Sequence, residues 1–582
     1  MEEMIEEGYL DTADPFSRMV ADLLVAHGVR EVVCSPGSRN APLLLAVASR
    51  DELRKHVVVD ERSAAFAALG MAMVSGEPVA LVCTSGTALL DYAPAVAEAY
   101  YQGVPLIVIS ADRPPQWIDQ DDSQTIRQPG ALAGFVKKTV DIPVAGREPG
   151  REMEWYVDRL VNDDMLTALS PQRGPVHINV RLAAPLGAVT VRQSGSPRVI
   201  EMLQGDFSLD TQAIKGLAEE AAGKKILIVA GFMPPSQKLN RAINSLIEIP
   251  GVAVFAELLS NLHIPGAFMA LDATLSNITE EEKEELRPDI VISIGGALVS
   301  RMLKEFLRTY PPKEHWSVGF SDPLPDCFMC MTRRIKADAA GFMSHFSGRL
   351  RHIYKTEPER AGDLRKVYTA AHLCACLNGV NRIKILIEKL SWWSDTIAFA
   401  YIMLLLPKKT NLFLSNGTPV RYAQLFGIDI PHAVFCNRGV SGIDGCTSTA
   451  IGGSAIYKDG PTLLVTGDMS FSYDVGALQL EMASPLMRII VINNSGGGIF
   501  RFIPSTSELP EQVRERYFCA PPNMDIEKVA EAFGWGYWLA DNPGILGETL
   551  KAFLSEEGGR RILEVRTPAS DSTEMLHEVL QR

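Results

Sequence analysis

The clearest structural signal in the chain comes from two stretches of its C-terminal third, TLLVTGD at 462–468 and RIIVINNSGGG at 488–498. Each starts as a run of aliphatic residues, which is typical of a buried strand in a parallel sheet, and then passes into small polar residues or glycines. Asn494 follows Asp468 by 26 residues (494 − 468), enough for one crossover helix, predicted at 474–482, before the chain returns in parallel. The pattern therefore places a carboxylate and an amide side by side at the carboxyl edge of one sheet.

These strand ends offer the ligands of a hard divalent cation. A carboxylate, an amide oxygen and a backbone carbonyl suit Mg²⁺, which usually completes its octahedron with oxygens from a substrate's phosphates. The glycines at 496–498 would let the backbone approach such phosphates closely. Asp and Asn are also ordinary turn residues, so either one alone would mean little. Together, at consecutive strand ends, they predict a site for a metal-bound diphosphate.

The same alternation of short apolar runs with helix-like stretches occurs in two regions upstream, so we predict an α/β fold of three doubly wound, mostly parallel sheets. The predicted domains are 1–190, 200–350 and 370–582, with linkers at 187–197 and 349–366. In such sheets ligands bind beyond the carboxyl ends of the strands. The predicted strands are 31–34, 57–60, 80–83, 105–110 and 176–180; then 225–230, 252–256, 290–294 and an edge near 315–319; then 411–415, 433–436, 462–466, 488–493 and 561–565.

Composition narrows the class of protein. The chain has 582 residues, of which 47% are hydrophobic and 22% charged, which is typical of a folded soluble protein. Its 56 Lys and Arg against 70 Asp and Glu give a net charge of −14, which argues against a nucleic-acid partner. The first ten residues are acidic, and the longest apolar run, 396–406, is too short to cross a bilayer. The nine cysteines show no disulfide framework, so we expect a cytoplasmic protein with no membrane partner.

The segment from Gly467 to Asn494 resembles the diphosphate-binding signature of thiamine-diphosphate (ThDP) enzymes, a GD followed at this spacing by NN. The resemblance implies a pyrimidine-binding domain (1–190), a central domain (200–350) and a diphosphate-binding domain (370–582). It also implies that Asp468, Asn494 and the carbonyl of Gly496 bind Mg²⁺, with Mn²⁺ as an alternative, and that this ion holds the cofactor's diphosphate. Enzymes of this class self-associate, so the resemblance implies a homodimer or homotetramer.

ThDP chemistry also needs a carboxylate beside the aminopyrimidine ring, so that the imino nitrogen of the ring can remove the proton from thiazolium C2. Glu61 follows the predicted strand at 57–60 and precedes an almost wholly apolar helix at 63–73. An unpaired carboxyl in such a place has a raised pKa, which suits a shared proton. Glu61 could instead cap that helix or pair with Arg62. With the diphosphate signature present we expect catalysis, and the resemblance implies that Glu61 serves the cofactor of another subunit.

Further motifs occur in order along the chain, and together they resemble the 2-succinyl-5-enolpyruvyl-6-hydroxy-3-cyclohexene-1-carboxylate (SEPHCHC) synthase family of menaquinone biosynthesis, also called MenD. The resemblance is strongest over 25–130 and 410–505 and weak over 200–405. It implies a transferase that decarboxylates 2-oxoglutarate and adds the resulting enamine to isochorismate by conjugate addition, giving SEPHCHC and CO₂. The motifs are SPGSRN (35–40), DER (60–62), TSGT (84–87), SADRP (110–114), QTIRQ (124–128), NRGVSGIDG (437–445) and NNSGGGIF (493–500).

Both of these substrates are dianions, so an acidic protein must supply convergent arginines, whose planar forks match carboxylates. By resemblance, Ile443 lies under the cofactor, and Ile499 and Phe500 form an apolar wall, although each could equally be a core residue. Arg301 is a further candidate for the substrate site and could equally be a solvated surface charge. The remaining residues that the resemblance assigns to the substrate site are Ser38, Arg39, Arg113, Gln124, Arg421 and Arg438.

The sequence departs from the family in one motif and leaves two other readings open. Where the family usually has Ser in an Asn-Ser-x-x-x-Arg run, this chain has Gly417, so a hydroxyl is lost or taken over by Thr418. A pyruvate-using relative such as an acetohydroxyacid synthase, which normally binds a flavin, is one alternative, and a catalytically silent protein of the same fold is another. None of the ten His residues has a His neighbour, which favours a ligase over a simple decarboxylase. For 370–410 we expect only a core helix or a contact between chains.

Overall fold

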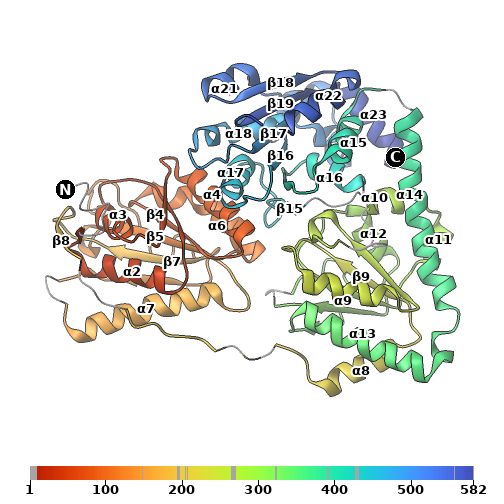
Figure 1. Ribbon diagram of the computed structural model, residues 1–582, viewed down its shortest axis with the longest axis horizontal. Helices are drawn as coiled ribbons and strands as arrows, with labels where there is room; N and C mark the ends of the chain where they lie inside the picture. The colour runs from red at the N-terminus through yellow and green to blue at the C-terminus, as the bar shows by residue number, and fades with distance from the viewer. Residues whose placement is uncertain are drawn as a thin grey trace. The chain divides into compact units, whose positions relative to one another are not determined.

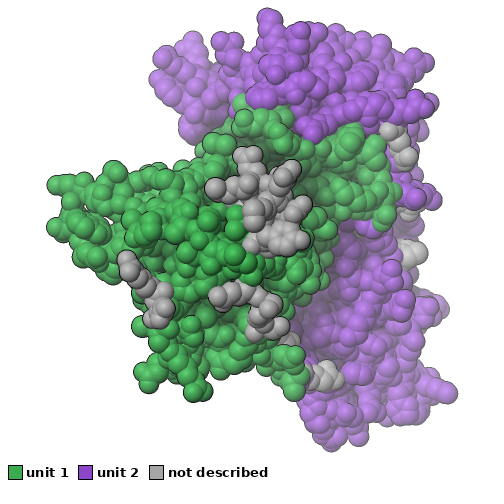
Figure 2. All heavy atoms as spheres, turned by 60° about the vertical axis from the view of Figure 1, so that its left-hand side comes forward, with its two compact units in different colours: residues 1–204, 437–462, 473–487 green, residues 205–436, 463–472, 488–582 purple. Residues whose placement is uncertain are grey.

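The computed structural model describes residues 10–146, 149–192, 197–203, 205, 207–263, 270–320, 324–389, 392–426, 432–555 and 557–580. The chain forms two compact units, coloured separately in Figure 2. Unit 1 comprises 1–204, 437–462 and 473–487, and unit 2 comprises 205–436, 463–472 and 488–582. Two segments of the predicted third domain therefore belong to the same unit as the N-terminal sheet.

Unit 1 contains a six-stranded parallel sheet in the order β3-β2-β4-β5-β7-β6. Helices α2 (Pro15–Ala26), α3 (Ala41–Ala48) and α7 (Arg151–Leu169) share an apolar core with one face of this sheet (Figure 1). From β2 the chain adds β3 on one side of the sheet and then β4 on the other side, so the direction of strand addition reverses between β2 and β4. The loops after these two strands therefore flank the position where a doubly wound sheet binds its ligand. The strands are β2 (Glu31–Cys34), β3 (Arg54–Val57), β4 (Val79–Cys83), β5 (Leu106–Asp112), β6 (Thr139–Ile142) and β7 (Val176–Arg181).

Two helices of unit 1 touch through their backbones. They are α4 (Glu61–Ser75) and α17 (Cys446–Ile456). A Cβ atom at Gly70 would lie 1.8 Å from the carbonyl oxygen of Thr449, and one at Gly452 would lie 1.9 Å from that of Ala67. Only glycine fits at these two positions, because any side chain would push the helices apart.

Unit 2 contains two further sheets. One has five parallel strands in the order β10-β9-β11-β12-β13, and the other has six strands in the order β15-β14-β16-β17-β19-β18. The six-stranded sheet repeats the strand order of the first sheet, and the five-stranded sheet repeats that order over its first four positions. The predicted α/β fold class is therefore confirmed. Their strands are β9 (Ile226–Ala230), β10 (Val252–Ala256), β11 (Ile290–Ile294), β12 (Glu314–Val318) and β13 (Arg333–Ile335); then β14 (Asn411–Leu414), β15 (Ala433–Phe435), β16 (Thr462–Gly467), β17 (Met487–Asn493), β18 (Gly536–Ala540) and β19 (Arg561–Arg566).

The 370–410 region folds into two helices, α14 (Ala370–Lys389) and α15 (Asp395–Leu405). In α15, Phe399, Ile402 and Met403 are buried in the core of the six-stranded sheet of unit 2. The apolar run is thus a core helix, as expected. Within the described part of the chain, no helix combines the length and the apolar character needed to cross a bilayer.

Both predicted linkers were wrong in part. The segment at 187–197 contains β8 (Val189–Val191), which pairs antiparallel with β1 (Leu10–Thr12). The segment at 349–366 begins inside α13 (Ala339–Thr356), whose apolar residues Phe346, Leu350 and Ile353 face the core. The high charge of that segment belongs to the exposed face of the helix and hid the apolar spacing.

Three other predicted elements were displaced. The strand expected at 57–60 is β3, which ends at Val57, because the side chain of Asp60 accepts a hydrogen bond from Ser63 N and caps α4. The crossover helix expected at 474–482 is instead α18 (Asp468–Tyr473) and a 3₁₀ turn at Val475–Gln479. The strand near 315–319 is not an edge, since β13 pairs beside it.

Candidate active site

In unit 2 the GD and NN loops lie side by side, as their spacing predicts. Asp468 follows β16 directly and Asn494 follows β17, its neighbour in the sheet. The backbone N–H of Gly496 donates to one carboxylate oxygen of Asp468 at 2.7 Å, and that of Met469 donates to the other at 2.7 Å. Burial raises the pKa of Asp468 to about 6, although these two hydrogen bonds oppose the rise.

The loop that carries Asn494 has a fixed backbone. Gly496 has φ +107°, and a Cβ atom there would lie 2.2 Å from the carbonyl oxygen of Cys519, so only glycine fits. The guanidinium of Arg501 donates to the carbonyl oxygens of Asn494 and Ser495 at 3.1 and 2.9 Å and pairs with Glu515 at 2.7 Å. These contacts were not predicted, because neither Arg501 nor Glu515 belongs to a recognisable sequence pattern.

The donor set at these strand ends fits a hard cation. The carboxylate of Asp468, the amide oxygen of Asn494 and the carbonyl of Gly496 are all oxygens, with no nitrogen or sulfur ligand among them. Asp468 and Asn494 are only 2% and 4% exposed, so a bound cation would compensate a carboxylate that burial otherwise penalises. Oxygen donors of this kind fit Mg²⁺, and a Mg²⁺ ion held there would in turn bind a diphosphate.

In unit 1 the side chain of Glu61 lies half-buried at the first position of α4. Burial raises its pKa, and the neighbouring carboxylates Asp91 and Asp60 add to the rise. The helix is capped by Asp60, whose carboxylate accepts hydrogen bonds from Ser63. Glu61 is therefore not the cap of its helix.

Arg62, the other partner considered for Glu61, is engaged elsewhere. Its guanidinium lies 5.2 Å from the ring centre of Tyr473 and 3.7 Å from the carboxylate of Asp474. The Asp474 carboxylate is fully buried and accepts hydrogen bonds from the backbone N–H and the hydroxyl of Ser448 at 2.7 and 2.9 Å. Asp474 therefore connects the first turn of α4, through Arg62, to the first turn of α17, through Ser448.

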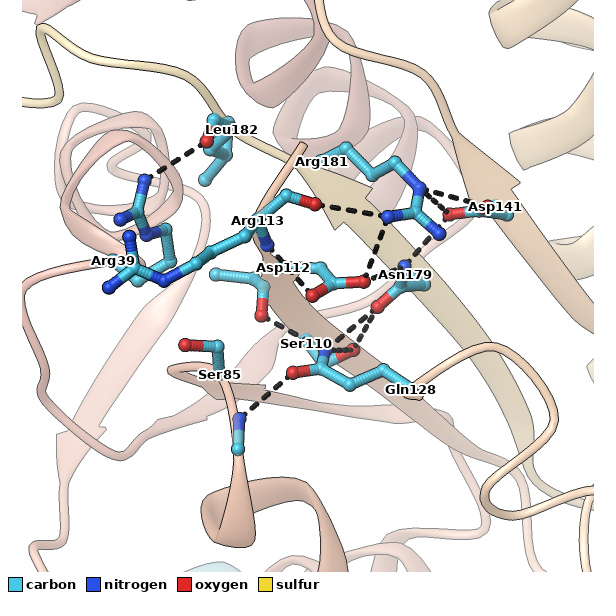
Figure 3. A network of polar contacts seen from close by, with 12 residues as sticks. Arg39, Ser85, Ser110, Asp112, Arg113, Gln128, Asp141, Asn179, Arg181 and Leu182 are labelled. Atoms are coloured by element: carbon cyan, nitrogen blue, oxygen red, sulfur yellow. Dashed lines mark hydrogen bonds and ion pairs between the residues drawn. The ribbon is translucent and has the colours of Figure 1, made fainter. Parts of the chain in front are cut away.

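Two of the predicted substrate arginines lie together at the carboxyl edge of the unit 1 sheet (Figure 3). Arg39 donates to the carbonyl oxygen of Leu182 at 3.1 Å, and Arg113 pairs with Asp122 at 2.6 Å and donates to the carbonyl oxygen of Ser123. Burial lowers the pKa of Arg39, and the positive charge of Arg113 lowers it further. Figure 3 shows the two side chains next to each other at this edge.

Gln128 supports this edge and was not predicted as a site residue. Its side-chain oxygen accepts from Gly86 N at 2.9 Å, and its amide group donates to Ala111 O and to Asn179 Oδ1 at 3.0 and 2.9 Å (Figure 3). The carbonyl of Gln124 accepts from the hydroxyl of Ser85 at 2.9 Å. The predicted substrate residue Gln124 is thus held against the TSGT loop, while its side chain stays exposed.

Ser38, Arg438 and Ile443 complete the predicted residues of unit 1. Ser38 is exposed in the loop after β2, and Arg438 and Ile443 are half-buried in the loop before α17. That loop is held by the buried carboxylate of Glu98, which accepts hydrogen bonds from Gly439 N and Val440 N at 2.5 and 2.8 Å. Glu98 lies on α6 (Ala93–Gln102), far away in the sequence, so no local pattern could reveal its contribution.

In unit 2, Arg301 and Arg421 line one cavity, together with Asp272, Thr418 and Phe502. Arg301 begins α12 (Arg301–Thr309), and the guanidinium of Arg421 donates to Val299 O at 3.4 Å. The structure therefore brings Arg301 beside a predicted substrate arginine, although Arg301 is also exposed.

Three further residues considered in the sequence lie in unit 2. Ile499 and Phe500 are half-buried in the 3₁₀ turn after the NN loop, where Phe500 packs against Phe518 at 5.9 Å between ring centres. Gly417 has φ +90°, a conformation in which a serine at this position would be strained.

Family comparisons match both ends of the chain. Residues 15–131 match the thiamine pyrophosphate enzyme N-terminal TPP binding domain, and residues 417–565 match the C-terminal TPP binding domain; TPP is another name for ThDP. A 2-succinyl-5-enolpyruvyl-6-hydroxy-3-cyclohexene-1-carboxylate synthase of Porphyromonas gingivalis is 41% identical, over 96% of this chain and 95% of the relative. Synthases of the same name from Flavobacterium johnsoniae and Cytophaga hutchinsonii are 33% and 36% identical, over 97% and 96% of this chain and 98% and 96% of theirs.

Proposed function

Because the chain belongs to the family of SEPHCHC synthases, ThDP-dependent transferases of menaquinone biosynthesis, we propose which of its residues carry out the family reaction. In that reaction 2-oxoglutarate loses CO₂ and the remaining four-carbon unit adds to isochorismate. Bound ThDP supplies an acidic carbon that adds to the 2-oxo acid and accepts the electron pair released with CO₂. The work left to the protein is to hold the cofactor, move one proton and orient two dianions.

The observation that carries this assignment is the hydrogen bond from Gly496 N to the Asp468 carboxylate at 2.7 Å, because it joins the two loops of the diphosphate signature. Asp468, Asn494 and the carbonyl of Gly496 bind Mg²⁺, or Mn²⁺ in its place, and through it the diphosphate. Arg501 donates hydrogen bonds to the backbone of this loop and so keeps it in one conformation, which supports its role in binding the metal and the diphosphate.

Glu61 shares a proton with the aminopyrimidine ring. Burial raises the pKa of the Glu61 carboxyl, which favours its protonated form and therefore a proton shared with the ring. Neither the helix cap nor Arg62 occupies its carboxyl, which leaves it available for the ring. Ile443 supports the cofactor from below, in a loop that Glu98 holds in place.

The arginines bind the carboxylates of the two substrates. Arg39 and Arg113 in unit 1, and Arg301 and Arg421 in unit 2, form two pairs that each suit one dianion. Ser38, Gln124 and Arg438 add polar contacts, and Ile499 and Phe500 provide an apolar wall. Thr418 lines the Arg301–Arg421 cavity and supplies the hydroxyl that Gly417 cannot.

The enzyme works as a homodimer or homotetramer in which Glu61 of one subunit serves the cofactor held by Asp468 and Asn494 of the partner subunit. Large apolar side chains in segments near Glu61 support a covering subunit: Val59 is 75% exposed, Leu90 42% and Tyr473 55%.

A donor and acceptor assay tests the function. Protein supplied with ThDP, Mg²⁺ and 2-oxoglutarate should release CO₂ slowly, and much faster once isochorismate is added. Pyruvate should not replace 2-oxoglutarate, because the arginine pairs require a second carboxylate. Equal turnover of pyruvate would refute the substrate assignment, and a yellow, flavin-containing protein would favour an acetohydroxyacid synthase-like activity.

A further inference from the structure

The buried carboxylate of Asp395 contacts the proposed metal ligand Asn494. Asp395 is the first residue of α15, in the region for which the sequence suggested no function, and its side chain is 1% exposed. One carboxylate oxygen accepts a hydrogen bond from the Asn494 amide group at 2.7 Å, and the other accepts from the Thr567 hydroxyl at 2.5 Å. The backbone N–H of Asp395 donates to the hydroxyl of Ser572 at 2.9 Å, which fixes the start of the helix.

This contact selects one of the two orientations of the Asn494 amide. An ionised carboxylate only accepts hydrogen bonds, so the NH₂ end of Asn494 must face Asp395 and the carbonyl oxygen must face the other way. Gly498 leaves room for this arrangement, because a Cβ atom there would lie 2.7 Å from the Asn494 amide nitrogen. A cation needs the oxygen end, so the orientation decides whether Asn494 can be a ligand at all.

The loop backbone does not depend on Asp395. Arg501 holds the carbonyl oxygens of Asn494 and Ser495, and Gly496 N is bound to Asp468. Changing Asp395 should therefore leave the loop in place and release only the amide of Asn494. The two supports act on different atoms of the same residue.

Resting on the function proposed above, we propose that Asp395 is a positioning residue of the metal site, which holds the oxygen of Asn494 toward the cation. It touches neither substrate nor cofactor and acts through Asn494. Outer partners of metal ligands commonly affect affinity in this way, since they fix the orientation of the ligand.

The test measures Mn²⁺ affinity at saturating ThDP, from the electron paramagnetic resonance signal of free Mn²⁺. Asp395→Asn should weaken Mn²⁺ binding by about 10-fold or more, because an amide at 395 pairs equally well with either end of Asn494. Thr567→Val is the matched control. This variant loses the hydrogen bond from the Thr567 hydroxyl to the Asp395 carboxylate, keeps the Asn494 contact, and should bind Mn²⁺ like the wild type.

A swap of the two side chains separates positioning from a merely structural role. Asn494→Asp alone places two carboxylates in contact and should weaken Mn²⁺ binding, whereas Asp395→Asn combined with Asn494→Asp restores one donor and one acceptor. The double variant should recover an affinity within about threefold of the wild type. A double variant that binds no better than Asn494→Asp would overturn the inference, and that comparison does not need Asp395→Asn to fold.

Asp468→Asn distinguishes failure of the inference from failure of the proposed function. If Asp468→Asn binds Mn²⁺ as the wild type does, the proposed ligand set is wrong and the inference falls with it. If Asp468→Asn loses Mn²⁺ while Asp395→Asn keeps wild-type affinity, only the role of Asp395 is refuted. Circular dichroism of each metal-free variant confirms that the fold is retained.

Discussion

The carboxyl of Glu61 is the part of the proposed catalytic apparatus that shares a proton with the cofactor. Exchanging it for a neutral isostere, Glu61→Gln, should leave ThDP binding almost intact while exchange of the cofactor's C2 proton slows by about 100-fold or more, the usual scale of a general acid–base contribution. Proton–deuterium exchange followed by NMR measures this rate. Glu77→Gln, a change to an exposed carboxylate just beyond the end of α4, is the control and should retain exchange. Unchanged exchange in Glu61→Gln would remove Glu61 from its role.

Thr418 tests the replacement of the usual serine. Thr418→Val keeps the shape of the side chain and removes the hydroxyl, so kcat/KM for 2-oxoglutarate should fall about tenfold, which corresponds to one lost hydrogen bond of about 1.4 kcal/mol. Thr418→Ser should retain most of the activity. Steady-state kinetics with both variants decide the matter, and equal values for Thr418→Val and the wild type would show that the hydroxyl is not used.

Among the elements, the contact between α4 and α17 leaves the least room for change. Gly70→Ala would place a methyl group 1.8 Å from the Thr449 carbonyl oxygen, so the helices must separate at a cost of about 1–3 kcal/mol. Gly216→Ala is the matched control, because Gly216 lies in α8 (Thr211–Ala221) with nothing within 4 Å of its would-be Cβ. Thermal unfolding should show a lower temperature for Gly70→Ala and an equal or higher one for Gly216→Ala. Equal unfolding temperatures of the two variants would mean that α4 and α17 accommodate the added methyl group without loss of stability.

The stability of the contact between α4 and α17 should change with pH because the buried carboxyl of Asp474 titrates. Burial raises its pKa to about 7 and Asp60 adds to the rise, while the bonds from Ser448 and the charge of Arg62 oppose it. Since this folded-state value exceeds the unfolded value of about 3.9, the stability contribution is present below about pH 4 and is lost as pH rises through about 7. Asp474→Asn cannot titrate, so its unfolding temperature should gain a few degrees on the wild type between about pH 5 and pH 8. If the unfolding temperatures of Asp474→Asn and the wild type changed with pH in parallel, this prediction would be contradicted.

The strands that sequence predicts best are those buried on both faces. β10 and β11 agree with the predicted runs residue for residue, because almost all of their residues are apolar and buried. β18 was missed because it is an edge strand with half-exposed side chains. Likewise β6 has only alternate residues buried and lacks a continuous apolar run.

The candidate site shows the same division. Asp468 and Asn494 were found because their positions follow from strand ends, which the local sequence marks. Glu98, Gln128 and Asp395 were missed because each acts on a loop distant in sequence, and only tertiary packing determines which backbone or side-chain group a buried polar residue meets.

For the whole molecule, an active site shared between subunits requires at least two chains. Sedimentation velocity at micromolar concentration should show a dimer or a tetramer. A monomer that remains fully active at the same concentration would contradict the shared site.

Two inactive variants, when combined, show whether Glu61 and the metal site of the partner subunit serve one cofactor. Glu61→Gln and Asp468→Asn should each be inactive alone. When the two chains are co-expressed with different tags and allowed to assemble at random, half of the dimers are mixed, and each mixed dimer contains one site with both residues intact. We expect about a quarter of the wild-type activity per chain, all of it in the doubly tagged fraction. No recovered activity in purified mixed dimers, with both parent variants folded, would show that Glu61 and the metal site of a partner subunit do not serve the same cofactor.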